Sequence, residues 1–236
     1  MSTPEPGAPA DAPNPAPKPA SRSAPRPASR SAPRSAPRPA PTPAPDRRAL
    51  ISDAAIALVA AGGLRSLTHR AVDGAAGLPA GSTSYYFRTR AALVGACYRR
   101  LAELDLADFE EDARTPGPWD RDAAARALGA LLHRWLTGGR ERQLARFELS
   151  LEAARTPEAA PELLRAGLAV RARAAGLLGA LGADRPDERA ALLAAWTDGL
   201  LYDRLAGALA GTRPAPDPAE LASTARLMID AALAAP

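Results

Sequence analysis

The composition of this chain changes abruptly at Pro45, and that change decides which part of it can build a hydrophobic core. Residues 1–45 hold 15 of the 25 prolines and contain no aromatic residue and no Leu, Ile or Val. Such a segment cannot bury enough apolar surface to offset the entropy lost on ordering. We therefore expect a disordered Pro/Ala/Arg-rich tail over residues 1–45. The remaining 191 residues are enough for one folded domain or two small ones.

The same tail carries all of the formal net charge of the chain. It holds two acidic and six basic groups, and the part that follows is formally neutral. The basic residues recur at every fourth position in a loose Ser-Ala-Pro-Arg repeat: Lys18, Arg22, Arg26, Arg30, Arg34 and Arg38. In an extended polyproline II chain they would lie about 12 Å apart. Three interpretations stay open: a solvated extension without a specific role, an arm that contacts DNA phosphates without reading sequence, and a ligand for PxxP-binding domains.

Several classes of protein are excluded by what the sequence lacks. One cysteine, Cys97, allows no disulfide framework and no CxxC metal site, and His69 and His133 are too far apart for local zinc-ligand spacing. Without a Gly-rich phosphate loop, a paired-carboxylate motif or a nucleophile near a base, we expect neither an enzyme nor a bound cofactor. With no long apolar run and no signal-peptide core, we expect a cytoplasmic protein without a membrane segment.

Beyond Pro45 the apolar residues follow helical spacing, and no segment alternates as a strand would. In the first helix, the buried face is expected to hold Leu50, Ile51, Ala54, Leu58 and Ala61. Prolines, glycines and capping residues, with a break at 115–118, separate the segments. Helices are predicted over residues 47–61, 69–76, 79–87, 89–111, 120–137, 140–155, about 160–181, 186–210 and from 217 onward. The sequence therefore predicts an all-α fold of about nine helices.

The first three helices follow a helix-turn-helix pattern. Thr68 is placed to cap the second helix, Gly77 forms the turn, and Pro79 suits the first turn of the third helix. That third helix offers small and polar side chains of the kind that reach base edges in the major groove of DNA: Ser82, Thr83, Ser84, Tyr85 and Tyr86. Basic residues able to hold phosphates flank the first and third helices: Arg47, Arg48, Arg88 and Arg90.

Residues 47–101 resemble the DNA-binding domain of the TetR (tetracycline-repressor) family of transcriptional regulators. The shared positions are Thr68, Ala71, Val72, Ala75, Ala76, Gly77, Leu78, Pro79, Ala80, Gly81, Ser82, Tyr85, Tyr86, Phe87, Arg90 and Leu93. The resemblance implies that the third helix reads DNA, that Phe87 closes the core of the domain and that Arg90 meets a phosphate. The other positions expected to contact DNA are Thr68, His69, Pro79, Ala80 and Gly81. The family carries a serine where Pro79 stands, so its side-chain cap is expected to be missing.

The resemblance also implies a division of the chain. We expect a helix-turn-helix domain over residues 46–92 and an all-helical effector-binding and dimerisation domain over residues 93–236. The helix at 186–210 is apolar on two sides, with Trp196 on one and Leu201 and Leu205 on the other, as expected of a helix that also packs against a partner. The resemblance implies a homodimer built by the last two helices. It also implies a ligand-responsive repressor on a pseudo-palindromic, double-stranded DNA operator.

A site for the small-molecule effector is expected in the second domain. Glu148 shares a predicted helix face with Leu144, Phe147 and Leu151, so its carboxylate must be paired, neutralised or turned toward a polar cavity. A structural, arginine-paired role and a ligand contact both stay open for it. The residues expected to line the effector site are Trp119, Trp135, Phe147, Glu148, Trp196 and Tyr202.

One other function is compatible with the sequence. A DNA-organising protein could bind DNA through the basic tail alone and respond to no ligand. The operator, the effector, the regulated genes and the choice between repression and activation are left open by the sequence.

Overall fold

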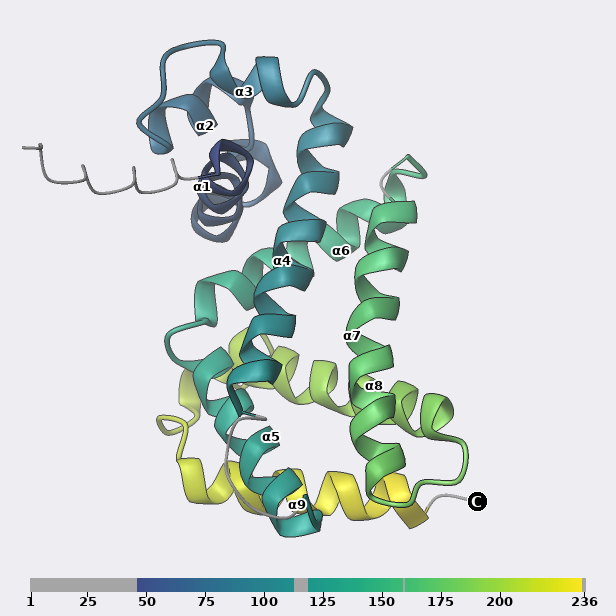
Figure 1. Ribbon diagram of the computed structural model, residues 1–236. Coiled ribbons are helices and arrows are strands. Elements are labelled where there is room, and N and C mark those ends of the chain that lie inside the picture. Colours follow the sequence, from purple (N-terminus) through teal and green to yellow (C-terminus); the bar gives the residue numbers. More distant parts are fainter. Residues whose placement is uncertain (1–45, 113–118, 159, 235–236) are drawn as a thin grey trace, which may run out of the picture. The chain divides into compact units, whose positions relative to one another are not determined.

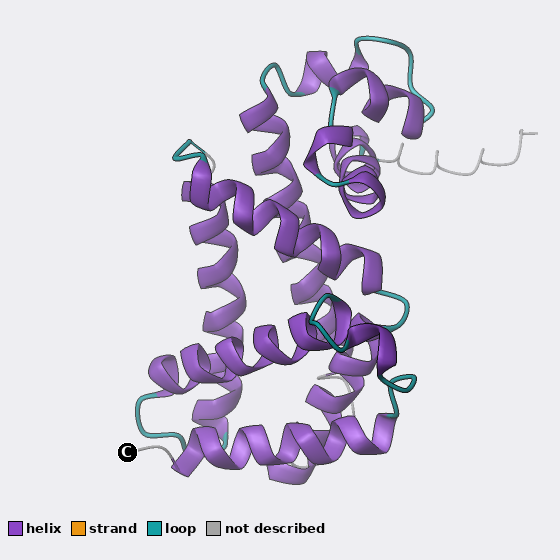
Figure 2. Cartoon of the chain, turned by 180° about the vertical axis from the view of Figure 1, so that it is seen from behind, coloured by secondary structure: helices purple, strands orange, loops and turns teal. Residues whose placement is uncertain are grey.

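The computed structural model describes residues 46–112, 119–158 and 160–234, and the tail at 1–45 and the predicted break at 115–118 lie outside them. The described part is all-helical and contains no strand, which confirms the predicted class (Figures 1 and 2). Its helices are α1 Arg47–Gly62, α2 His69–Ala75, α3 Ser82–Tyr86, α4 Arg90–Asp112, α5 Arg121–Leu136, α6 Arg140–Arg155, α7 Ala160–Ala180, α8 Pro186–Leu205 and α9 Pro218–Ala234. Two short 3-10 turns, η1 Leu64–Ser66 and η2 Ala210–Thr212, complete the set.

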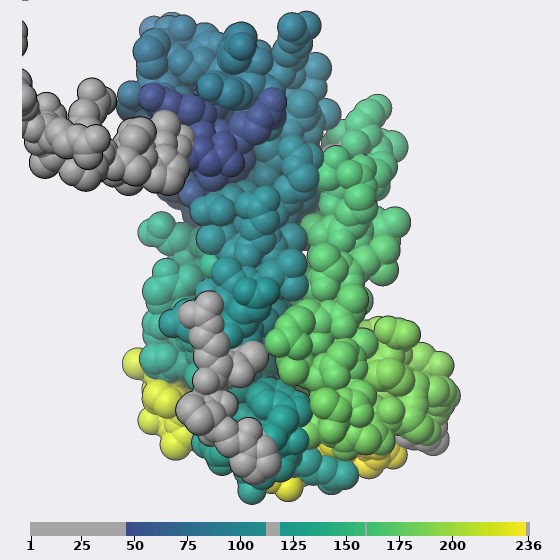
Figure 3. All heavy atoms as spheres, in the orientation of Figure 1, coloured from purple at the N-terminus to yellow at the C-terminus, as the bar shows by residue number. Residues whose placement is uncertain are grey.

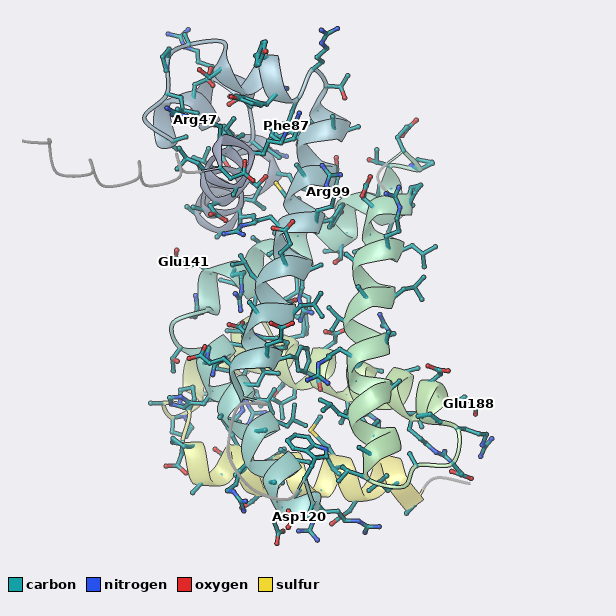
Figure 4. The ribbon with its side chains drawn as sticks, viewed as in Figure 1. Arg47, Phe87, Arg99, Asp120, Glu141 and Glu188 are labelled. Carbon is teal, nitrogen blue, oxygen red and sulfur yellow. The ribbon has the colours of Figure 1, made fainter. Side chains whose placement is uncertain are left out.

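The head is formed by α1, α2, α3 and the first turns of α4. Its core gathers Ile51 and Val59 from α1, Val72 from α2, Phe87 after α3 and Leu93 from α4. Phe87 is buried there, as predicted (Figure 4). These residues exclude water from one apolar cluster, which stabilises three short helices that could not persist alone.

The buried face of α1 differs from the predicted one. Ala61 is exposed and Leu50 is half-buried, whereas Ala55, Ile56 and Val59 are buried. The true face is rotated because α1 packs against both α4 and α6, and a run rich in alanine and leucine offers apolar residues on every side. Local periodicity cannot choose a face in such a run.

The body consists of α4 to α9, and α4 belongs to both parts. The predicted boundary between residues 92 and 93 falls inside α4, whose Leu93 and Cys97 lie in the head core together with Leu149 of α6. The buried hydroxyl of Tyr98 on α4 donates a hydrogen bond to the Leu149 carbonyl. Burial also raises the pKa of the Cys97 thiol to about 12, so this side chain stays a neutral core residue.

Two helices of the body approach each other unusually closely. α5 and α9 lie side by side in both views (Figures 1 and 2). A Cβ atom added to Gly129 on α5 would lie 2.6 Å from the Cα atom of Ala222 on α9. Glycine is therefore required at 129 for this separation. None of the described helices is both long enough and apolar enough to span a bilayer.

Candidate functional site

The turn between α2 and α3 determines where the third helix begins. Gly81 has φ +91°, a left-handed conformation that glycine adopts without strain. The helix starts only after it, at Ser82, whose hydroxyl donates to the Pro79 carbonyl at 2.6 Å. The prediction of a third helix starting at Pro79 is therefore wrong, because a left-handed residue cannot lie within a right-handed helix. Pro79, Ala80 and Gly81 form an exposed turn instead.

The cap of α3 comes from another helix. The buried carboxylate of Asp73 on α2 accepts the backbone amide of Gly81 on one oxygen and that of Thr83 on the other, each at 2.7 Å. Burial alone would raise the pKa of this carboxyl, but the hydrogen bonds from Thr83 and Gly81 outweigh burial and leave the pKa below its usual value of 3.8. Asp73 thus supplies the side-chain acceptors at the start of α3, where the capping position is Gly81 and has no side chain of its own to do so. The sequence did hold one sign of this cap, because Asp73 is a charged residue next to Val72 on the buried side of α2.

One side of α3 faces away from the head. Ser84, Tyr85 and Arg88 are exposed, and the Tyr85 side chain retains 80% of its accessible surface. Tyr86 is half-buried and meets the Tyr85 ring edge-on, with 5.2 Å between the ring centroids. An exposed serine and tyrosine on a short helix, with an exposed arginine two residues beyond its end, can reach base edges and phosphates together.

Thr83 lies on the other side of this helix. Its side chain is fully buried, with 0% of its surface accessible, so the predicted contact of Thr83 with bases is wrong. Because α3 has few residues, its inward face must close the head core between Val72 and Phe87. A threonine within a polar run gave no local sign of that burial.

Several predicted DNA-contacting side chains also bind the head itself. Arg90 donates to the carbonyls of Leu67 at 2.5 Å and Leu64 at 2.8 Å, and His69 Nε2 donates to the Phe87 carbonyl at 2.7 Å. These bonds hold η1 and the end of α3 in place. The groups left for phosphate are therefore the outward edge of Arg90 and the other ring nitrogen of His69.

The start of α1 and the start of α2 contribute further polar groups. Arg48 lies over the rings of Tyr86 and Phe87, with its guanidinium carbon 5.5 Å and 5.3 Å from their centroids. Arg47 is exposed on the head (Figure 4). Thr68 caps α2 as predicted, because its hydroxyl accepts the amide of Ala71 at 3.1 Å.

A cavity of about 680 Å³ lies within the body, among α4, α5, α6, α7 and α8. In the space-filling view the atoms of α7, in green, lie against those of α4, in teal (Figure 3). The wall of this cavity is mostly apolar and includes Trp135 and Phe147, two of the residues expected to contact the effector. A space of this size suits a small organic molecule.

Other predicted effector contacts lie elsewhere. Glu148 and Leu151 are both exposed on α6, so the face predicted to be apolar is not the buried one. Ala145, Leu149 and Ala153, spaced four residues apart, are buried instead. Trp119 lines a smaller apolar cavity of about 60 Å³, which shares Phe109 and Leu128 with the wall of the larger one. Trp196 and Tyr202 are exposed on α8 and are absent from the described walls of both cavities.

The cavity wall also carries charges that were not predicted. Asp105 on α4 and Asp198 on α8 face Arg146 on α6, and Arg171 on α7 completes the charged lining. Asp105 lies four residues after Leu101 and four before Phe109, so all three share one face of α4. That position within an apolar face could have predicted its burial. The described residues hold no cluster of His, Cys, Asp or Glu suited to a metal ion.

Comparison with known proteins places the chain in a family. A family model described as "Tetracyclin repressor-like, C-terminal domain" matches residues 119–235. None of the curated proteins matches the chain.

Solved structures match across the head and the body. A transcriptional regulator from Rhodococcus sp. Rha1 is 25% identical, with a TM-score of 0.63 over 80% of this chain and 96% of its own. A member of the TetR family from Streptomyces coelicolor A3 is 28% identical, with a TM-score of 0.60 over 78% and 98%. The multidrug binding protein EbrR, in complex with ethidium, is 29% identical, with a TM-score of 0.58 over 78% and 98%. With the helix-turn-helix head, the cavity-bearing body and these matches, the chain belongs to the TetR family of DNA-binding transcriptional regulators.

Proposed function

We propose that the protein is a homodimeric, ligand-responsive repressor that binds a pseudo-palindromic operator through α3. The observation that carries this proposal is the exposed set of Ser84 and Tyr85 on α3 and Arg88 just after it, while Thr83 on the same helix is buried. Ser84 and Tyr85 would read base edges, and Arg88 would hold a phosphate.

Phosphate contacts from neighbouring elements would fix the register of the head on DNA. Arg47 and Thr68 are exposed at the starts of α1 and α2, and Arg70 adds an exposed cation in the first turn of α2. Helix starts also carry partial positive charge from their free amides, which favours phosphate. The turn at 79–81 would bring its backbone close to the same strand.

Dimerisation is supported by apolar side chains that the described residues leave exposed. Leu192 and Trp196 lie on one face of α8, and Leu227 on α9 is 72% exposed. On the other side of α8, Leu201 and Leu205 are buried within the body. A second copy covering the exposed face would bury these residues and place two heads on a two-fold axis.

A response to ligand would require the two states of the body to differ in affinity for it. The cavity is lined by Tyr98 of α4, whose hydroxyl is bonded to Leu149 in the core that the head shares with α6. A ligand that displaced α4 or α6 would therefore change the packing of these helices against the head. EbrR, the multidrug binding protein, forms complexes with ethidium and malachite green, which supports a small aromatic effector here.

Selection of bound fragments from random duplex DNA tests this proposal. We expect one enriched motif, made of two inverted half-sites about one helical turn (34 Å) or more apart. Purified protein should shift that duplex as a dimer. Enrichment of no motif, with tail-dependent binding of every duplex, would favour the DNA-organising alternative.

A further inference from the structure

One buried carboxylate in the cavity has no close partner. Asp105 is only 3% exposed, and it lines the cavity from α4. Its Oδ1 atom finds no hydrogen-bond donor among the described residues. A buried, ionised carboxylate without donors is costly, so a site of this kind is suited to a ligand that supplies them.

The nearby arginines of α6 are engaged by other carboxylates. Arg142 Nη2 lies 3.7 Å from Asp105 Oδ1 but makes a much closer ion pair with Asp108. Arg146 Nη2 donates to Asp198 Oδ1 of α8 at 3.0 Å. Arg134 on α5 also pairs with Asp108, at 3.6 Å. Of the three carboxylates, Asp105 is therefore the one without a short charge-assisted hydrogen bond among the described residues.

The remaining charge on the wall lies toward solvent. Arg171 on α7 is exposed, and its Nη1 donates to the Gly167 carbonyl at 3.4 Å. It therefore marks a water-accessible part of the wall, where its charge is screened. The negative end of the cavity is at Asp105, and the positive charge is distributed around it on paired or hydrated groups.

The rest of the wall is suited to an apolar, flat molecule. Phe109 and Trp135 meet edge to face, with centroids 6.1 Å apart, and Phe147 lies on the neighbouring helix α6. The indole nitrogen of Trp135 donates to Asp108 at 2.7 Å, so its polar edge is already satisfied. Aromatic rings of this kind bind flat ligands by stacking. The Arg146 guanidinium already lies over the rings of Trp135 and Phe147, 5.7 Å and 5.4 Å from their centroids, so stacking is the contact they offer a ligand.

The geometry points to a cationic aromatic effector whose positive nitrogen lies against the Asp105 carboxylate. This inference rests on the proposed ligand response and specifies the chemical class of the effector at that cavity. Asp105 would give the charge preference, and the aromatic wall would give the affinity for the ring system.

The titration of Asp105 supports this assignment. Burial raises the pKa of the carboxyl to about 6, with Arg146 and Arg142 lowering it and Asp108 and Asp198 raising it. At pH 7.5 the free carboxylate is mostly charged, and at pH 5 it is mostly neutral. Affinity for a permanent cation should therefore fall on acidification.

The test uses two fluorescent probes on the full chain without DNA. Ethidium is a permanent cation, and N-phenyl-1-naphthylamine is a neutral aromatic molecule. We expect Asp105→Asn to weaken ethidium binding tenfold or more and to leave the neutral probe within about twofold, because the variant removes the charge attraction between the carboxylate and the cation. The control is Glu103→Gln on the same helix, an exposed residue paired with Arg100, which should change neither affinity.

Acidification gives a second readout that needs no variant. Ethidium binding to the wild-type chain should weaken by about tenfold from pH 7.5 to pH 5, while binding of the neutral probe stays constant. Equal ethidium affinity in Asp105→Asn and wild type, or no pH dependence, would overturn the assignment of Asp105 and leave ligand binding intact. Failure of the wild-type chain to bind either probe would overturn both this inference and the proposed ligand response.

Discussion

The carboxylate of Asp73 on α2 accepts the backbone amide of Thr83 on α3 at 2.7 Å, so one helix of the head holds the first turn of the next. We expect Asp73→Ala to destabilise the protein by about 1–2 kcal/mol, because it leaves two amides of α3 without their acceptor. Thermal or urea unfolding measures the loss. Ser82→Ala, which removes an exposed hydroxyl at the same turn, should cost much less, and equal effects of the two would contradict the capping role.

The same carboxylate predicts how the stability of the head depends on pH. Its pKa is lowered in the folded state, so its contribution is complete above the unfolded value of 3.8 and is lost as the pH falls through the folded value. The difference in unfolding free energy between wild type and Asp73→Ala should therefore be constant from pH 7 to about pH 5 and shrink in more acidic solution. A difference that grows on acidification would contradict this.

Local signals in the sequence were enough for some of these features and not for others. Thr68 caps the helix next to it, so its role could be predicted from residues within one turn. Asp73 caps a helix eight to ten residues away, and only the folded turn brings it there. The start of α3 was misplaced for the same reason, because proline at 79 is a local signal and the cap is not.

Burial of polar residues was equally hard to predict. Glu148 and Asp105 each lie within an apolar stripe of the sequence, yet one is exposed and the other is buried in the cavity wall. The outcome depends on which helices pack over each face, and that information is absent from a single helix. The helical class and most helix ends depend on local spacing and caps, which is why they could be predicted.

Gly129 provides a test of the close α5–α9 packing. Gly129→Ala should destabilise the protein by about 1–3 kcal/mol, because the new methyl group would overlap the backbone of Ala222. The control is Gly176→Ala on α7, where nothing lies within 4 Å of an added Cβ. That change should stabilise the helix by about 0.5–1 kcal/mol. Thermal melts that shift in the same direction for both variants would contradict the assignment.

The exposed apolar face of α8 and α9 should determine the oligomeric state. We expect Trp196→Arg combined with Leu227→Arg to convert a dimer into a folded monomer, since two charges would have to be buried at the contact. Light scattering after size exclusion gives the mass, and circular dichroism reports the fold. Leu151→Arg, at an exposed leucine on α6, is the matched control and should remain dimeric. A dimer that persists in the double variant would place the contact elsewhere.

The salt dependence of binding tests whether the basic tail contacts DNA. If its six cations contact phosphates, deletion of residues 1–45 should flatten the slope of log affinity against log salt by as much as about 5, at about 0.9 per contact. Sequence preference should stay the same, because the tail reads no bases. An unchanged slope would assign the tail to a solvated extension.

The most direct test of the account is a gel shift on the selected duplex with Tyr85→Ala and with the chain lacking residues 1–45. The account predicts that Tyr85→Ala retains its fold but binds at least tenfold more weakly, because a specific base contact contributes about 1–3 kcal/mol. The tail deletion should still discriminate the selected duplex from a scrambled one. Wild-type affinity in Tyr85→Ala, together with loss of all discrimination on tail deletion, would contradict the claim that α3 reads the operator.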